Sequence, residues 1–115
     1  MNDWIVPLAT FEAQLAGSER PSWQGLAHGT MRLYLFSPGG RDVPTLQGLV
    51  ETNHAQDEIY IVLRGTCAFS KNGEVREIRA GDVVFVEAQA THQFEAYSPD
   101  FAAWVVFWGP PGGEG

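Results

Sequence analysis

Residues 54–65 combine side chains that bind metal ions with a run that favours a β-strand. They read His-Ala-Gln-Asp-Glu-Ile-Tyr-Ile-Val-Leu-Arg-Gly. Alternate side chains of an extended strand share one face. In this segment one face carries His54, Gln56, Glu58 and Tyr60. Because imidazole and carboxylate groups bind first-row transition metals, the pairing of His54 with Glu58 predicts a metal site on that face.

A second imidazole, His92, follows another apolar segment, residues 81–87. Two strands that deliver donors to one interior would form a metal pocket inside a β-barrel. Each donor also has an ordinary alternative: a surface histidine at a strand end for His54, a solvated charge for Glu58, and an exposed loop histidine for His92. Asp57 alternates to the opposite face of its strand, so we do not expect it to bind the metal.

The composition describes one small, acidic, folded domain. The chain has 115 residues, of which 44% are hydrophobic, and 7 basic against 14 acidic residues give a net charge of −7. A negative net charge disfavours binding to nucleic acids or anionic membranes, because both attract positive potential. We therefore expect neither a nucleic acid nor a membrane as partner.

No segment of the sequence indicates export or membrane insertion. The N-terminal residues lack the basic region and long apolar run of a signal peptide. The longest apolar run, residues 101–108, is far shorter than the ~20 residues that span a bilayer. We expect a cytoplasmic protein. Cys67 is the only cysteine, which excludes an internal disulfide and thiolate metal clusters, and it is expected to be buried.

Short strands separated by turn residues indicate an all-β fold. One short helix is expected at residues 10–17, capped by Thr10 and ended by Gly17. The Asn72-Gly73 pair predicts a tight hairpin, because both residues tolerate positive φ. The expected strands cover residues 30–37, 51–63, 66–70, 74–79, 83–87, 92–97 and 101–108.

Strands of this length and spacing favour a small barrel or a double-sheet jelly roll. We expect residues 1–29 to form an N-terminal extension that holds the short helix and an edge strand. Residues 30–108 would form the barrel. Residues 109–115, rich in glycine and proline, are expected to be a flexible tail.

Two motifs in this chain resemble those of the cupin superfamily. The first cupin motif is Gly-x5-His-x-His-x3–4-Glu-x6-Gly, and His54, Glu58 and Gly65 match its second histidine, glutamate and final glycine. The second motif is Gly-x5-Pro-x-Gly-x2-His-x3-Asn, whose first glycine and histidine correspond to Gly81 and His92.

The chain departs from both cupin motifs at several positions. Thr52, or Asn53 under the longer spacing, stands where the first histidine belongs. Glu87, Gln89 and Ala96 replace the proline, glycine and asparagine of the second motif.

The resemblance implies a cupin-type double-stranded β-helix, or jelly-roll barrel, with a metal site of His54, Glu58 and His92. Two imidazoles and one carboxylate are the ligands of the facial triad that holds Fe(II), and Zn, Mn and Ni remain open. Gln56 and Thr52 could act as weak ligands or as hydrogen-bond partners of the ligands. The aromatic side chains expected to line the pocket are those of Tyr60, Phe94 and Trp104.

Three functions are compatible with this resemblance. The first is a metal-dependent enzyme of the dioxygenase or isomerase type that acts on a small metabolite. The second is a non-catalytic module that binds or senses a small ligand. The third is an apo cupin whose remaining motif serves only the fold. Small cupins commonly pair through an edge strand, so the resemblance also suggests a homodimer.

Overall fold

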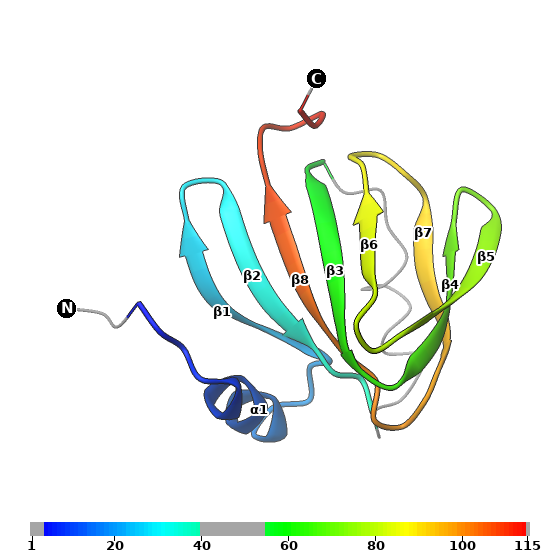
Figure 1. Ribbon diagram of the computed structural model, residues 1–115. Helices are drawn as coiled ribbons and strands as arrows, with labels where there is room; N and C mark the ends of the chain where they lie inside the picture. The colour runs from blue at the N-terminus through cyan, green and yellow to red at the C-terminus, as the bar shows by residue number, and fades with distance from the viewer. Residues whose placement is uncertain (1–3, 40–54, 115) are drawn as a thin grey trace.

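The computed structural model describes residues 4–39 and 55–114, which are mostly β-strands (Figure 1). The one helix in these ranges is α1 (Leu8–Ala16). The strands are β1 (Ser22–His28), β2 (Met31–Phe36), β3 (Asp57–Arg64), β4 (Thr66–Lys71), β5 (Glu74–Arg79), β6 (Val83–Val86), β7 (His92–Tyr97) and β8 (Ala102–Trp108). Within the described ranges, no helix has the length and apolarity that crossing a lipid bilayer requires.

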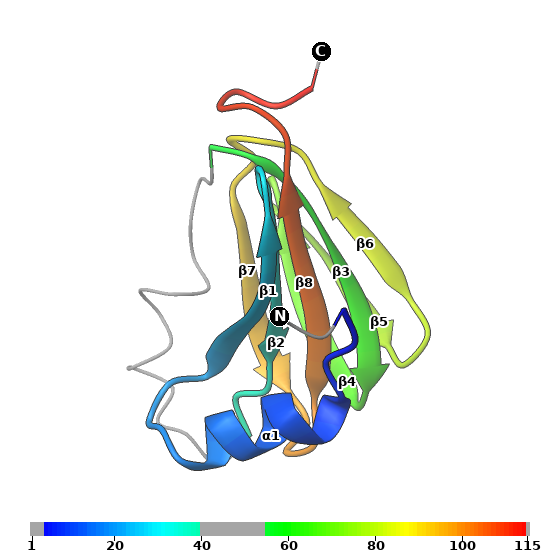
Figure 2. The same cartoon turned by 90° about the vertical axis from the view of Figure 1, so that its left-hand side faces the viewer.

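Two antiparallel sheets form the barrel. The larger sheet has five strands in the order β1-β2-β8-β3-β6, and the smaller has three in the order β5-β4-β7. Figure 1 shows the larger sheet running from β1 to β6. In Figure 2, turned by 90°, α1 lies across the lower end of the strands. This arrangement confirms the predicted all-β jelly-roll barrel with one short N-terminal helix.

Local turn chemistry sets the hairpin between β4 and β5. Asn72 and Gly73 join these strands with φ values of 51° and 86°, and Lys71 pairs with Glu74 across the turn. Both turn residues therefore adopt the positive φ that the sequence predicted. For the long strand expected at residues 51–63, the structure describes β3 from Asp57 onward, and residues 51–54 lie outside the described part of the chain.

Strand β8 is apolar on both faces because a different neighbour covers each face. Ala103, Val105 and Phe107 belong to the core between the two sheets. Ala102 and Trp104 point the other way and join a second apolar cluster around α1. The unbroken apolar run that the sequence shows at residues 101–108 thus reflects a strand covered on both sides at this end.

Helix α1 is held by packing rather than by a capping side chain. Phe11 and Leu15 are buried one turn apart, and the Phe11 ring contacts Trp23 and Trp104 edge to face, with centroids 5.2 and 5.0 Å apart. The helix begins at Leu8, with Pro7 as its N-cap and no side-chain capping bond. The expected start at Thr10 was therefore wrong, since burial of apolar side chains stabilises a short helix more than a cap does.

The C-terminal residues 109–114, expected to be a flexible tail, are tied to the barrel by hydrogen bonds. The backbone N–H of Gly112 donates to the Ala55 carbonyl at 2.7 Å. Asp57 accepts a bond from the backbone N–H of Glu114 at 2.9 Å and another from Ala88 at 2.8 Å. Asp57 lies on the outer face of β3 as its parity predicted, yet it is buried because the tail covers it.

Gly65 closes the first motif because no side chain fits at this position. Its φ is +79°, and a Cβ atom built there would lie 2.7 Å from the Phe101 Cα atom. A Gly65→Ala change therefore combines backbone strain with a clash against main chain, and should lower the free energy of unfolding by more than about 3 kcal/mol. Urea denaturation followed by tryptophan fluorescence measures this loss.

Gly73→Ala is the matched control for Gly65→Ala. Gly73 has a similar φ of +86°, but a Cβ atom there would meet nothing within 4 Å. The Gly73→Ala variant should therefore lower the free energy of unfolding only by the backbone strain, about 1–2 kcal/mol. Equal losses for the two variants would show that the close approach to Phe101 does not explain the glycine.

Candidate metal centre

Glu58 and His92 meet in the interior from opposite sheets. Glu58 lies on β3 of the larger sheet, and His92 begins β7 of the smaller sheet. Each side chain is only 1% exposed, and the His92 Nε2 atom lies 3.5 Å from the Glu58 Oε2 atom. The sequence predicted that both residues belong to one site, although 33 residues lie between them in the chain. The structure brings these two side chains together.

A backbone carbonyl fixes the orientation of the His92 ring. The His92 Nδ1 atom lies 2.9 Å from the Ala90 carbonyl oxygen. A carbonyl only accepts, so Nδ1 carries the proton in this bond, and in the neutral ring Nε2 presents its lone pair toward Glu58. Burial lowers the pKa of His92 below its ordinary value, which favours that neutral form. A histidine that binds a metal is normally oriented in this manner.

The surroundings of Glu58 disfavour its charged form. Burial is the largest effect and raises the pKa of Glu58 to about 7, while a hydrogen bond with Tyr60 and the nearby Arg32 cation act in the opposite direction. Without a further cation, Glu58 therefore exchanges its proton near neutral pH. A buried carboxyl group in this state gains stability from a cation that replaces the proton.

The spacing of Glu58 and His92 fits a shared metal ion. Nitrogen and oxygen ligands lie about 2.0–2.2 Å from zinc, so two ligands at a tetrahedral angle are roughly 3.3–3.6 Å apart. The Nε2–Oε2 distance of 3.5 Å falls in this range. Within residues 4–39 and 55–114, no three His, Cys, Asp or Glu side chains form a group that could hold a metal. His54 and Thr52, which the sequence also nominated, lie outside the described residues.

Glu58 also borders a cavity of about 230 Å³ inside the barrel. Its floor is the larger sheet, where Arg32 on β2 pairs with Phe107 on β8, and Phe107 pairs with Glu58 on β3. Residues paired directly across strands point to the same face. One row of the sheet therefore presents a cation, an aromatic ring and a carboxyl group to the cavity.

Aromatic side chains make up most of the remaining wall. Tyr60 lines the cavity, and so does Phe94 from the opposite sheet, with their ring centroids 4.9 Å apart. Trp104 does not line it, because Trp104 alternates to the outer face of β8 and packs against Phe11. The expectation that Trp104 faces the pocket is therefore corrected. Strand β8 is apolar on its outer face as well, because α1 packs there, and the sequence alone did not show which of the two apolar faces lines the pocket.

Gln56 contacts Arg32 rather than the Glu58–His92 pair. Its amide nitrogen donates to the backbone carbonyls of Thr30 and Gly109 at 3.0 and 2.9 Å. This fixes its Oε1 atom, which accepts a short hydrogen bond from the Arg32 guanidinium. Gln56 thus positions Arg32 at the cavity wall.

Arg32 was not nominated from the sequence. The available signal was its parity with Tyr34 and Phe36, which places a cation on the same face as two aromatic rings. This parity did not decide the orientation of the strand, because Leu33 and Leu35 make its other face more apolar. Their pattern favours that other face as the inner one.

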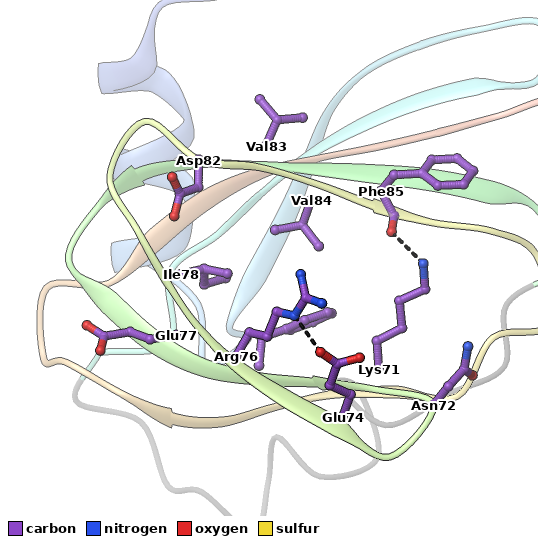
Figure 3. A pocket seen from close by; sticks show the side chains of 11 residues that line it. Lys71, Asn72, Glu74, Arg76, Glu77, Ile78, Asp82, Val83, Val84 and Phe85 are labelled. Carbon is purple, nitrogen blue, oxygen red and sulfur yellow. Dashed lines mark hydrogen bonds and ion pairs between the residues drawn. The ribbon is translucent and has the colours of Figure 1, made fainter.

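A second and larger cleft, of about 550 Å³, opens between β5 and β6 (Figure 3). Its charged side chains already have partners: Arg76 bonds Glu74 at 2.6 Å, and Lys71 donates to the Phe85 carbonyl at 3.0 Å. These contacts are drawn in Figure 3, and the cleft lining includes neither Glu58 nor His92. We therefore assign the candidate site to the buried pair of Glu58 and His92 and to the smaller cavity that Glu58 borders.

A family model for the cupin domain matches residues 32–108. This chain belongs to the cupin family. It is 33% identical over 104 residues to an uncharacterised protein of Streptomyces coelicolor, and the match covers 90% of this chain and 93% of that protein.

Solved structures share this fold. A Cupin 2 conserved barrel domain protein from Salinispora arenicola superimposes with a TM-score of 0.65 at 20% identity, covering 95% of this cupin and 91% of that chain. The DMSP lyase DddQ from Ruegeria pomeroyi is 26% identical with a TM-score of 0.59. That match covers 76% of this cupin but only 46% of the lyase.

The raised pKa of Glu58 predicts a pH dependence of stability in chelator-treated protein. The pKa is higher in the folded than in the unfolded state, so the contribution of Glu58 to stability is complete below pH 4.5 and is lost as pH rises through about 7. Between pH 5.5 and pH 8 this loss should be on the order of 2 kcal/mol. Urea denaturation at the two pH values measures it.

The variant Glu58→Gln should lack this loss, because an amide does not titrate. His92 acts in the opposite direction, since its lowered pKa costs stability as pH falls. Subtracting the Glu58→Gln data from the parent data therefore isolates the glutamate. Glu74→Gln, at an exposed position on β5, is the control and should keep the parent's pH dependence. A parent and Glu58→Gln variant with the same dependence would contradict the assignment.

Proposed function

We propose that this cupin binds a divalent transition metal through Glu58 and His92, with His54 as the third ligand, and acts on a small molecule held in the adjoining cavity. The observation that carries the proposal is the buried pair of Glu58 and His92, 3.5 Å apart. A carboxylate oxygen and an imidazole nitrogen are both ligands of divalent transition metals. At this separation one ion could be bound by both groups, and it would hold the carboxyl group in its charged form.

The metal, when bound, would polarise a substrate oxygen or activate O₂. The protein's own groups have separate tasks. Glu58 supplies negative charge to the ion, and the Nδ1–Ala90 bond holds the His92 ring in place. Tyr60 lies beside Glu58, and burial raises the pKa of its hydroxyl well above its ordinary value, so this hydroxyl stays protonated and can donate a hydrogen bond.

The position of Glu58 supports an enzyme rather than a structural metal site. A structural site is closed by its ligands, whereas a catalytic site leaves a position open to substrate. Glu58 lines the cavity of about 230 Å³, so a ligand there would lie next to the proposed ion. The similarity to the lyase DddQ supports the same view, because that protein is an enzyme on this fold.

Metal content tests the proposal directly. Protein purified without chelators should hold a near-stoichiometric transition metal, and Glu58→Gln, His92→Gln and His54→Ala should each lower metal affinity by more than about tenfold. Elemental analysis and competition with a chromogenic chelator measure both quantities. The controls are Glu74→Gln and His28→Gln, which change exposed residues of the same types. Parent-like metal content in the Glu58 and His92 variants would overturn the proposal.

Oxygen consumption separates the reaction types. A dioxygenase loaded with Fe(II) should take up O₂ only when a substrate from a panel of small metabolites is present. An isomerase should convert its substrate without O₂ and should accept Zn, Mn or Ni.

A further inference from the structure

We infer that the cavity binds a small organic acid with a flat apolar body, and that Arg32 binds its carboxylate. This inference rests on the proposed function in that it takes the same cavity as the ligand site. It adds the chemical class of the ligand and the residue that selects it.

Arg32 is a half-buried cation at the cavity wall whose hydrogen-bond partners, Gln56 and Tyr34, are neutral. Its guanidinium donates to the Gln56 Oε1 atom and, at 3.4 Å, to the Tyr34 hydroxyl. It also lies 4.8 Å from the centroid of the Phe107 ring. Among the residues that the structure describes, no carboxylate forms an ion pair with Arg32. Guanidinium has five N–H donors in a planar fork, so donors remain for a carboxylate.

The surrounding structure holds this cation in a defined position. The protein carries a net charge of −7, so a basic residue facing the interior does not reflect a generally basic surface. Gln56 is itself held by two backbone carbonyls and fixes the guanidinium in place. A side chain held in this way loses little conformational entropy when a ligand binds.

The row from Arg32 through Phe107 to Glu58 sets the length and character of the ligand. Neighbouring strands lie 4.7–4.9 Å apart, so the backbones of Arg32 and Glu58 are about 10 Å apart. Phe107 lies between them, and Phe94 and Tyr60 face the same space. A flat apolar body would pack on these rings while its carboxylate meets Arg32.

The volume of the cavity indicates a small acid. At about 230 Å³ the cavity is smaller than the ~300–1,000 Å³ of sites for drug-sized ligands. It suits a molecule on the order of ten non-hydrogen atoms. The opposite end of such a ligand would lie beside Glu58, where the proposed ion would offset the charge of the glutamate.

Benzoate is the probe, with benzamide as its neutral counterpart of the same shape. Isothermal titration calorimetry on the metal-loaded parent should show benzoate binding at least tenfold tighter than benzamide, because only benzoate carries the charge that Arg32 pairs with. Arg32→Met should remove this preference, and Arg32→Lys should retain part of it. Arg76→Met, which changes an exposed arginine on β5, should bind benzoate as the parent does.

Parallel measurements of metal content separate this inference from the proposed function. Equal affinity for benzoate and benzamide, or no binding of either, in a parent that holds metal would overturn the inference and leave the proposed function standing. Benzoate binding that depends on Arg32 in a parent without metal would support the inference and overturn the metal assignment. The comparison of the two probes needs no variant, so it stands even if Arg32→Met does not fold.

Discussion

The contact between Glu58 and His92 sets the central physical constraint in this structure, because it places two ionisable groups inside an apolar barrel. Both are 1% exposed, and their surroundings shift the pKa of the carboxyl group up and that of the imidazole down. Each shift favours the neutral form of its group. Burial of this kind is costly for folding, and this cost is the physical basis on which we propose a functional site here.

The two-sheet architecture creates this contact and the cavity beside it. Glu58 comes from the larger sheet and His92 from the smaller, so neither sheet alone could form the pair. The pairing register then adds Arg32 and Phe107 to the same row as Glu58. A shift of one residue in either pairing would turn Arg32 or Glu58 to the outer face. Register is thus a determinant of the site as well as of the core.

Elements outside the core hold this register in place. Helix α1 covers the outer face of the larger sheet at one end of its strands, where Phe11 packs on Trp104. At the other end, the Asp57 carboxylate accepts hydrogen bonds from the backbone N–H groups of Ala88 and of Glu114 in the C-terminal tail. Asp57 is the neighbour of Glu58, so its bonds on the outer face restrain the strand that carries Glu58 on the inner face. The tail thereby contributes to the position of the site without touching it.

The sequence by itself determined the fold class, most strand positions, the Asn72-Gly73 hairpin and the spacing of the two cupin motifs. These features depend on local rules: alternation along a strand, positive φ in a turn, and fixed intervals between donors. His54 was predicted on the same basis and stays a prediction, because it lies outside the described residues.

Only the tertiary structure decided which face of each strand is inside. Strands β2 and β8 are apolar on both faces, so alternation could not show that Arg32 faces the cavity while Trp104 faces α1. It also decided the contacts of Gln56, Asp57 and the tail, whose partners are distant in sequence. Such contacts form when a sheet, a helix or the tail packs against a distant segment of the chain. A local sequence pattern carries no information about which distant segment that is.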